Sequence, residues 1–341
     1  MTQNIAFVAT HGGPLDAADS ILAQPVPMPT PEPTDLIVQV RGIGLNPVDD
    51  KLRAALPANS GPRIFGHDAV GRVVATGTAV RDFTVGDRVL YAGTTTRPGS
   101  FQQFQAVHAA LCAHAPAQLP DVALAGLSLV GLTAWELLFE KMGFTPAADA
   151  NHGRSLLIIN GAGGVGTLMS QLAHWAGLTV LATASPRNFA WLTQHGVTHP
   201  LDYHADLVAA VHQTGYPTVD GVAILYTTEP YLAAASALVA PFGHVGALVT
   251  PQGPLTVTAL KAKAASLDFE YMFAKSDYGW HEASQGAILT QLVALVAAGV
   301  LDPGVTTHDT PITVGNLKAG FTRLAAGHQV GKVVLTGDFT L

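Results

Sequence analysis

Three glycines near the middle of the chain, Gly161, Gly163 and Gly166, have the spacing G-x-G-x-x-G. An apolar run of branched side chains, 156–159, precedes them, and apolar residues at helical spacing follow as far as Trp175. This pattern is typical of a buried parallel strand that turns tightly into a helix. Glycine permits the tight turn, lets the backbone approach a pyrophosphate, and lets the helix pack closely on the strand. The unpaired N–H groups at the helix start can then bind phosphate oxygens.

We therefore predict a dinucleotide site whose phosphate-binding turn consists of Gly161, Gly163, Gly164, Val165 and Gly166. The spacing alone is weak, because 35 residues of the chain are Gly and a plain strand–turn–helix also uses packing glycines. The strand before the turn and the helix after it favour the nucleotide.

The end of the next predicted strand indicates which dinucleotide binds. An NAD-binding sheet has an acidic residue about 20 positions after the glycines, where it accepts from the ribose 2′-hydroxyl. Here that strand ends without an acid and is followed by Ser185 and Arg187. These residues, with Tyr203 at the end of the third predicted strand, can donate to a 2′-phosphate. We predict NADPH rather than NADH; the alternative is that Ser185 only caps the next helix and Arg187 is solvated.

Strands and helices alternate around this turn. Strands are expected at 155–160, 179–184, 199–203, 220–226 and 244–249, with helices at 165–176, 187–195, 204–213 and 230–240. This order predicts a doubly wound parallel sheet that is buried on both faces. Beyond it, we expect a strand at 267–273 and a helix at 282–299.

The first 120 residues have a different pattern, with short predicted strands separated by Gly and Pro. We expect a Greek-key or barrel-like β domain there. The residues from 304 onward return to short strands and turns. The fold class is therefore α/β, with a β domain formed by 1–124 and 300–341 and a nucleotide-binding domain at 125–299 inserted in its sequence.

Composition argues against several classes. Charged residues make up 12% of the chain and the net charge is −7, which disfavours a nucleic-acid or anionic-membrane surface. A single cysteine, Cys112, excludes an intramolecular disulfide or a four-cysteine zinc site, and we expect a buried, inert thiol. The charge-free stretches 122–135 and 283–301 are respectively too short and too polar to span a membrane. Because no Lys or Arg precedes Arg41, a secretory signal is not expected, and the predicted location is cytoplasmic.

Several further motifs occur in a fixed order: GHDAVGRVVATG at 66–77, VGDRV at 85–89, GLTAWE at 131–136, the glycine turn, and GKVV at 331–334. In these motifs the chain resembles the medium-chain dehydrogenases/reductases over nearly its whole length. The resemblance implies a GroES-like β-barrel-type catalytic domain and a Rossmann nucleotide-binding domain. Within the superfamily, the chain is more similar to quinone oxidoreductases and enone reductases than to zinc alcohol dehydrogenases.

The zinc members of this superfamily bind their catalytic metal through a cysteine, a histidine and a second cysteine. The resemblance puts Asn46 where the first cysteine belongs, His67 at the histidine, and 127–132, which contains no cysteine, at the third position. Cys112 is at none of these positions. We therefore expect no metal and a structural role for His67. Asp68 as a replacement oxygen ligand is the alternative.

The resemblance also implies where the reacting groups lie. Asn46 is expected at the floor of the active site, where its amide donates to a developing enolate or quinol oxygen. Asp49 and Lys51 follow on the same loop and would orient the substrate or relay a proton. The alternative is that Asn46 only forms a turn and Asp49 only caps a helix. Thr133 is expected to contact the nicotinamide end of the cofactor, and Phe273 is expected to lie beside the cofactor.

The predicted reaction is hydride transfer from NADPH to a quinone or an α,β-unsaturated carbonyl without zinc. Such acceptors are already electron-poor, so positioning them against the nicotinamide supplies much of the rate. The alternatives are a zinc-type alcohol or carbonyl dehydrogenase that uses His67, and an NADPH-binding redox sensor or structural protein without turnover. The expected partners are the small-molecule substrate and a second copy of the chain in a homodimer, with no nucleic acid and no membrane.

Overall fold

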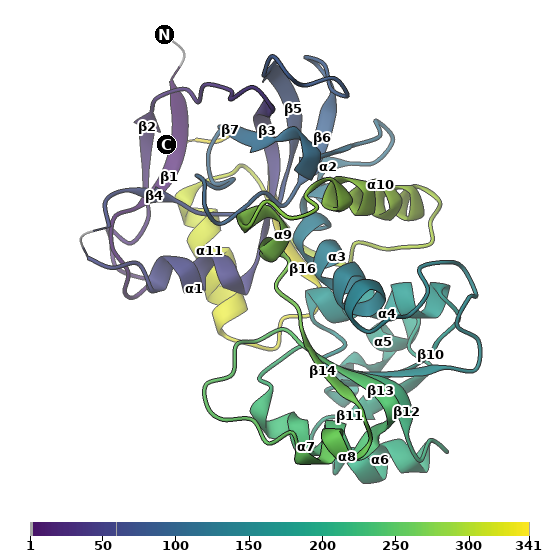
Figure 1. Ribbon diagram of the computed structural model, residues 1–341. Coiled ribbons are helices and arrows are strands. Elements are labelled where there is room, and N and C mark those ends of the chain that lie inside the picture. The colour runs from purple at the N-terminus through teal and green to yellow at the C-terminus, as the bar shows by residue number, and fades with distance from the viewer. Residues whose placement is uncertain (1–2, 59, 341) are drawn as a thin grey trace. The chain divides into compact units, whose positions relative to one another are not determined.

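The computed structural model describes residues 3–58 and 60–340. It divides into two compact units that share no β-sheet among these residues (Figure 1). Unit 1 comprises residues 1–129, 273–299 and 303–341, and unit 2 comprises residues 130–272 and 300–302.

Unit 2 is built on a six-stranded parallel sheet with the order β11-β10-β9-β12-β13-β14. Its elements, with the helix that leads into them, are α3 (Ser128–Trp135), the π-helix η2 (Glu136–Lys141), β9 (Ser155–Ile159), α4 (Gly164–Trp175), β10 (Thr179–Ala184), the 3-10 helix η3 (Pro186–Asn188), α5 (Phe189–Gln194), β11 (His199–Asp202), α6 (Leu207–Gln213), β12 (Val219–Ile224), α7 (Glu229–Leu238), β13 (Val239–Ala247), α8 (Thr258–Ala262) and β14 (Ser266–Phe269). The chain starts this sheet in its middle and builds outward first on one side and then on the other. This confirms the predicted doubly wound sheet.

Helices cover the faces of this sheet, which explains its apolar strands. β9 is buried along its whole length. Leu157 of β9 and Val222 of β12 share one apolar core with Leu232 and Leu238 of α7. Each of these four side chains is less than a tenth exposed, so the strands need no polar alternation.

Unit 1 contains a seven-stranded sheet with the order β15-β16-β3-β5-β6-β8, to which β7 adds by pairing with β3, and a three-stranded sheet with the order β2-β1-β4. Its elements are β1 (Asn4–Ala9), β2 (Leu22–Val26), β3 (Asp35–Leu45), α1 (Pro47–Ala54), β4 (Arg63–Ile64), β5 (Ala69–Thr76), β6 (Arg88–Tyr91), β7 (Phe104–His108), the 3-10 helix η1 (Ala109–Leu111), β8 (Ala113–His114), α2 (Asp121–Ala125), α9 (Phe273–Asp277), α10 (Ala283–Ala297), β15 (Val305–Asp309), α11 (Val314–Ala325) and β16 (Lys332–Thr336). β16 pairs antiparallel with β3, so the end of the chain rejoins the N-terminal β domain as expected.

The prediction that only short strands and turns follow residue 304 was wrong at 314–325. These residues form α11, whose first turn is capped by Thr313, because its hydroxyl accepts a hydrogen bond from the N–H of Asn316. Leu317 and Phe321, one helical turn apart, are buried in the core of unit 1. Two glycines inside the helix weaken the local signal, and burial of this apolar face outweighs them.

The strand expected at 267–273 was too long. It ends at Phe269, opposite Ala247, where its neighbour β13 also ends. Because β14 is at the edge of the sheet, no strand remains to pair with the chain beyond this point. The chain then forms the short helix α9.

Residues 273–299 lie with unit 1, whereas the sequence assigns them to the nucleotide-binding domain. The reason is tertiary contact that no local pattern encodes. α10 packs against β6, β8 and η1. Asp277 of α9 accepts hydrogen bonds from the hydroxyl groups of Thr94 and Thr95, each at 2.6 Å.

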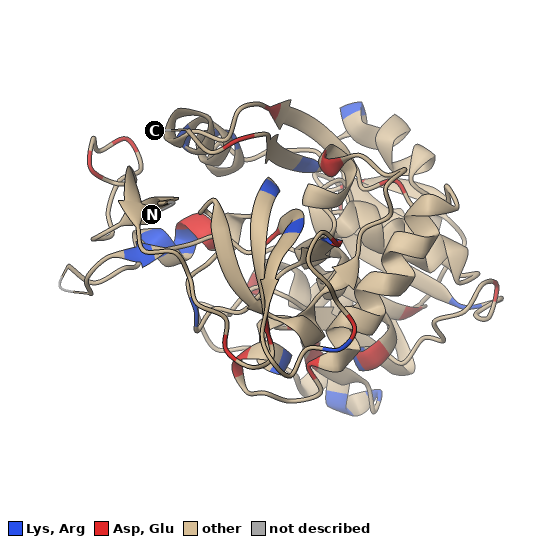
Figure 2. Ribbon diagram, turned by 90° about the horizontal axis from the view of Figure 1, so that it is seen from above, with Lys and Arg blue, Asp and Glu red and all other residues tan. Residues whose placement is uncertain are grey.

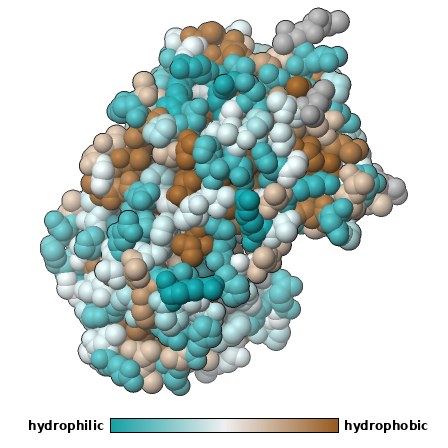
Figure 3. All heavy atoms as spheres, turned by 180° about the vertical axis from the view of Figure 1, so that it is seen from behind, coloured by the Kyte–Doolittle hydropathy of each residue, from teal (hydrophilic) through white to brown (hydrophobic). Residues whose placement is uncertain are grey.

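Charged residues of both signs are interspersed along the chain in the view of Figure 2, in keeping with the modest net charge. On the face shown in Figure 3, small apolar patches lie between polar ones. In the described part of the chain, no helix is both long enough and apolar enough to cross a membrane.

Candidate functional site

The glycine turn lies between β9 and α4, as predicted. A Cβ on Gly166 would lie 2.4 Å from the carbonyl oxygen of Asn160, and a Cβ on Gly161 would lie 2.7 Å from the Cβ of Ala182 on β10. Both positions are therefore closed to side chains. Around Gly163 the nearest atom would be 3.1 Å away, at the end of the flexible Asn160 side chain. The turn is packed tightly at its two outer glycines and less tightly at the central one.

Helix α4 presents its N-terminus at this turn. Gly163 is the capping residue, and Gly164 and Val165 are the first two residues of the helix. All three are partly exposed, whereas Gly161 and Gly166 are buried. The first N–H groups of a helix have no partner within it and favour an anion. This geometry suits a phosphate group.

The residues predicted to bind a 2′-phosphate lie at the same edge of the sheet. Ser185 directly follows β10 and Tyr203 directly follows β11, and β10 lies between β11 and β9 in the parallel sheet. Arg187 is exposed in η3, and the Tyr203 side chain is 38% exposed. The Ser185 side chain makes no capping hydrogen bond, so the alternative role of helix cap does not describe it.

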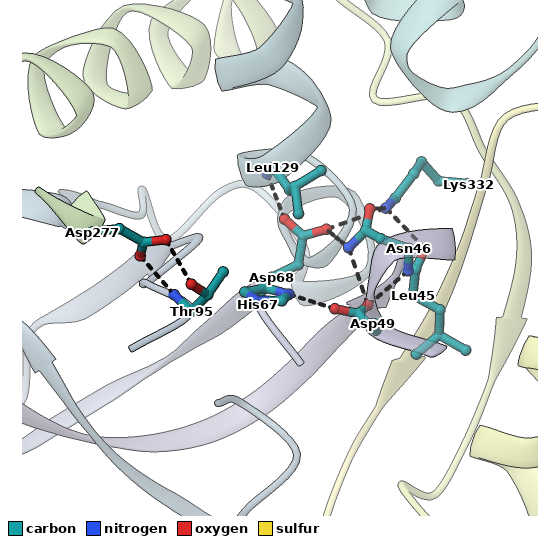
Figure 4. A network of polar contacts seen from close by, with 9 residues as sticks. All are labelled: Leu45, Asn46, Asp49, His67, Asp68, Thr95, Leu129, Asp277 and Lys332. Carbon is teal, nitrogen blue, oxygen red and sulfur yellow. Dashed lines mark hydrogen bonds and ion pairs between the residues drawn. The ribbon is translucent and has the colours of Figure 1, made fainter. Parts of the chain in front are cut away.

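A second group of candidate site residues is buried in unit 1, around Asn46 (Figure 4). Asn46 directly follows β3 and caps α1. Its Nδ2 donates to Oδ2 of Asp68 at 2.9 Å and to Oδ2 of Asp49 at 3.4 Å. Its Oδ1 accepts from Nζ of Lys332 at 2.6 Å. The amide that the sequence assigned to substrate binding is therefore fully engaged within the protein.

Asp49 has two partners, and one of them gives it the helix-capping role that the sequence left open. Its Oδ2 accepts from the backbone N–H of Asn46 at 2.8 Å, which caps the first turn of α1. Its Oδ1 lies 2.5 Å from Nδ1 of His67. Asp49 is fully buried, so it holds the imidazole in one orientation as well as starting the helix.

The two ring nitrogens of His67 differ in their hydrogen bonding within the described residues. Its ring is buried and lies against the ring of Phe273, with 4.4 Å between the centroids. Nδ1 is bound to Asp49, whereas Nε2 has no hydrogen-bond partner among the described residues. An imidazole held in this way can accept or donate a proton through Nε2.

Lys332 comes from the far end of the sequence. β16 pairs with β3 so that Val333 lies opposite Leu45, which brings Lys332 beside Asn46. Its buried Nζ donates to the Leu45 carbonyl at 3.1 Å and to Oδ2 of Asp68 at 3.1 Å, in addition to Asn46. Lys332 thus satisfies three oxygens at once.

Asp68 is the shared centre of this network. It directly precedes β5, and the antiparallel pairing of β3 with β5 brings it beside Asn46. Its Oδ2 accepts from Asn46 and Lys332, and its Oδ1 accepts from the backbone N–H of Leu129 at 2.6 Å. The carboxylate is fully buried and satisfied on both oxygens.

The three places at which the resemblance puts zinc ligands meet in this network. They are Asn46, His67 and the segment 127–132, which arrives through Leu129. Only His67 offers a nitrogen or sulfur ligand, and catalytic zinc sites in proteins use at least three protein ligands. Asp68 is already occupied by an ammonium and two N–H donors. The residues present do not fit a catalytic zinc ion, and no group of three His, Cys, Asp or Glu within residues 3–58 and 60–340 could hold a metal.

The other predicted site residues are placed elsewhere. Lys51 is exposed on α1, and its side chain makes no hydrogen bond to the described residues. Thr133 is buried in α3. Cys112 is buried in unit 1, and burial raises the pKa of its thiol. The structure therefore brings together Asn46 and Asp49 but not Lys51.

Sequence reasoning missed Lys332 as part of this site and considered Asp68 only as an alternative metal ligand. A signal was present for Lys332, because it lies in an otherwise apolar run at 331–335. A charge in a buried strand requires a partner. The sequence does not say which partner.

A cavity of about 220 Å³ lies elsewhere in unit 1. Two pairs form among its lining residues: Arg97 with Asp35 at 2.7 Å, and His108 with Glu282 at 2.9 Å. None of the residues predicted for the site lines this cavity.

Comparisons with known proteins agree with this architecture. Residues 32–119 match the family model of the alcohol dehydrogenase GroES-like domain, and residues 195–335 match that of the zinc-binding dehydrogenases. A zinc-type alcohol dehydrogenase-like protein of Staphylococcus aureus is 34% identical over 309 residues, which cover 90% of this chain and 92% of that protein. The trans-enoyl reductase milB of Cordyceps militaris is 28% identical over 333 residues and 90% of each chain.

Among solved structures, a putative zinc-dependent alcohol dehydrogenase protein from Rhizobium etli is 32% identical and superposes with a TM-score of 0.92 over 99% of each chain. The two family models, in this order, and relatives of this identity and coverage agree with the parallel nucleotide-binding sheet, the GroES-like unit and the motifs at 66–77 and 331–334. The chain is thus an oxidoreductase that belongs to the medium-chain dehydrogenase/reductase superfamily.

Proposed function

We propose that this chain is an NADPH-dependent oxidoreductase that transfers a hydride to a quinone or an α,β-unsaturated carbonyl without zinc. The observation that supports the proposal most directly is the set of residues where the superfamily's zinc ligands converge. The only imidazole among these described residues, that of His67, is bound to the carboxylate of Asp49. The amide of Asn46 donates to the carboxylate of Asp68 and accepts from the ammonium of Lys332. An acceptor that is already electron-poor needs only positioning and a proton. Similarity to a trans-enoyl reductase is in keeping with such an acceptor.

His67 is the group to which we assign the acceptor oxygen. Asp49 binds Nδ1 and so directs Nε2 away from the network. Bound NADPH supplies the hydride; the oxygen of the acceptor then gains negative charge, and a protonated Nε2 can donate to it. In this proposal His67 takes the donor role that the sequence assigned to Asn46, because both N–H groups of Asn46 are held by carboxylates.

The choice of NADPH rests on the edge of the sheet in unit 2. No acidic residue follows β10, and Ser185, Arg187 and Tyr203 lie after two adjacent strands with donor groups accessible. A guanidinium and two hydroxyl groups suit a dianionic 2′-phosphate better than a neutral 2′-hydroxyl. This arrangement is what we expect of an NADPH-preferring member.

A single assay series tests the proposal. Purified protein is mixed with NADPH or NADH and a panel of quinones, enones, aldehydes and alcohols, before and after treatment with a chelator. We expect NADPH oxidation by a quinone or an enone at a rate that the chelator leaves unchanged. One zinc ion per chain by elemental analysis, together with loss of activity on chelation, would instead indicate the alcohol or carbonyl dehydrogenase. Tight NADPH binding without turnover of any acceptor would indicate a redox sensor or a structural protein.

A further inference from the structure

Lys332 is a charged residue at the first position of β16, directly before the buried apolar residues Val333 to Leu335. Its side chain is 4% exposed. Burying an ammonium is costly unless its donors are satisfied and its charge is balanced. Here the Leu45 carbonyl, Asn46 Oδ1 and Asp68 Oδ2 take all three N–H donors. The three oxygens therefore form a cation site, and the cation that occupies it is the ammonium group of Lys332.

The oxygens that Lys332 binds are of the kind that a divalent metal ion would use. Carboxylate and amide oxygens are ordinary ligands of divalent cations. With the ammonium bound, Oδ2 of Asp68 and Oδ1 of Asn46 are both occupied, and an ion entering beside them would meet a fixed positive charge. Without the ammonium, two buried carboxylates, Asp49 and Asp68, would share Nδ2 of Asn46 as a donor and have no lysine to balance their charge.

We propose that Lys332 is a built-in cation that keeps divalent metal ions out of this centre and holds Asn46 and Asp68 in their present positions. Lys332 is thus a positioning residue, since it acts through Asn46 and Asp68. This inference rests on the reaction without zinc that is proposed above, and it assigns the exclusion of the metal ion to Lys332.

The test is metal binding, measured without any turnover. The full-length protein is stripped with a chelator and titrated with Co²⁺, whose visible absorption reports ligands from the protein. The variants are Lys332→Met, Lys332→Arg, and Lys332→Met combined with Asp68→Asn. Lys261→Met is the matched control, since Lys261 is exposed on α8. Thermal melting and NADPH binding establish that each variant is folded.

We expect Co²⁺ to bind the Lys332→Met variant at one ion per chain, about tenfold or more tightly than it binds the wild type, because a carboxylate and an amide oxygen become available. The Lys332→Arg variant, the Lys261→Met control and the double variant should behave as the wild type does. If Lys332→Met does not fold, Lys332→Gln carries the same test, since its amide can still donate to Asp68.

Two results would overturn the proposal. One is a folded Lys332 variant without its ammonium that binds Co²⁺ no better than the wild type does. The other is a wild type that already binds one Co²⁺ ion in a manner that His67→Gln abolishes. Because the titration involves no acceptor, inactivity towards quinones and enones would refute the proposed function and leave this result standing.

Discussion

Oδ1 of Asp49 lies 2.5 Å from Nδ1 of His67, and both side chains are buried. The same carboxylate caps the first turn of α1 through the N–H of Asn46. A residue that begins a helix thus also fixes the imidazole of the proposed site. The arrangement resembles the way in which carboxylates orient functional histidines in other proteins, where the bound nitrogen decides which way the free nitrogen points.

Removing either the carboxylate that orients His67 or the imidazole itself should slow turnover. We expect Asp49→Asn and His67→Gln each to lower kcat for the best quinone or enone by about a hundredfold, the usual contribution of a positioned acid or base. The KM for NADPH should change little, since the residues predicted to bind its phosphate groups are in unit 2. Steady-state kinetics check this, with Lys51→Ala, an exposed change on the same helix, as the control.

Loss of activity in the Lys51→Ala control equal to that of the two variants would contradict this assignment. It would restore Lys51 to the proton-relay role that the sequence suggested. Melting temperatures of all three variants separate an effect on turnover from loss of α1.

The cofactor preference should depend on Arg187. Arg187→Ala removes a charge-assisted hydrogen bond to a 2′-phosphate, which contributes roughly 1.5–3 kcal/mol and therefore raises the KM for NADPH about 10- to 100-fold. The KM for NADH should be unchanged, because NADH has no phosphate there. Arg323→Ala on α11 is the control. An equal loss for both cofactors would show that Arg187 supports the fold rather than the phosphate.

The glycine turn makes a steric prediction. A methyl group at position 166 would lie 2.4 Å from the carbonyl oxygen of Asn160, whereas one at position 253 meets nothing within 4 Å. We expect Gly166→Ala to weaken NADPH binding by more than about tenfold and to lower stability by roughly 1–3 kcal/mol. Gly253→Ala, in the same unit, should do neither. Fluorescence titration with NADPH and urea unfolding measure the two effects.

Two parts of the candidate site were predictable from sequence because they are local. The glycine turn is encoded within a few residues, and Asn46 and Asp49 are three positions apart at a helix start. Lys332 is different, because it reaches Asn46 across 286 positions. Its place depends on the pairing of β16 with β3, and strand pairing is not set by the local pattern. The Leu129 N–H that completes Asp68 is likewise 61 positions from it.

The fold shows the same division between local and distant information. The strands of unit 2 and its helices α4 to α7 follow from apolar runs and their spacing and were predicted, whereas α8 and the first residues of β13, from Val239, were not. The helix α11 was missed, because Leu317 and Phe321 are anchored by distant parts of the core and two glycines obscure the helical pattern. The grouping of residues 273–299 with unit 1 depends on contacts such as that between Asp277 and Thr95.

The buried thiol offers a simple check on the core of unit 1. Cys112 is 5% exposed, and burial raises the pKa of its thiol, so the reactive thiolate is scarce. We expect no reaction with a thiol-specific reagent such as DTNB while the protein is folded, and one equivalent of reaction after unfolding in guanidinium. Rapid labelling of the native protein would show that this region opens readily.

The last prediction concerns acid stability and Asp35, at the start of β3. Burial alone would raise the pKa of this carboxyl, but hydrogen bonds from the Arg97 guanidinium and the Glu32 N–H outweigh burial and lower it. A folded-state pKa below the unfolded value of about 3.9 means that the unfolded chain binds more protons at acid pH. The contribution of Asp35 to the free energy of unfolding is therefore fully present above pH ~4 and is lost as the pH falls through the folded-state pKa.

We expect Asp35→Asn to lower the free energy of unfolding by about 2 kcal/mol at pH 7. The difference from the wild type should shrink steadily below pH ~4, as measured by urea unfolding at several pH values. The exposed change Asp82→Asn should show no such pH-dependent difference, and a constant deficit for Asp35→Asn at every pH would mean that its pairing with Arg97 contributes through packing rather than through charge.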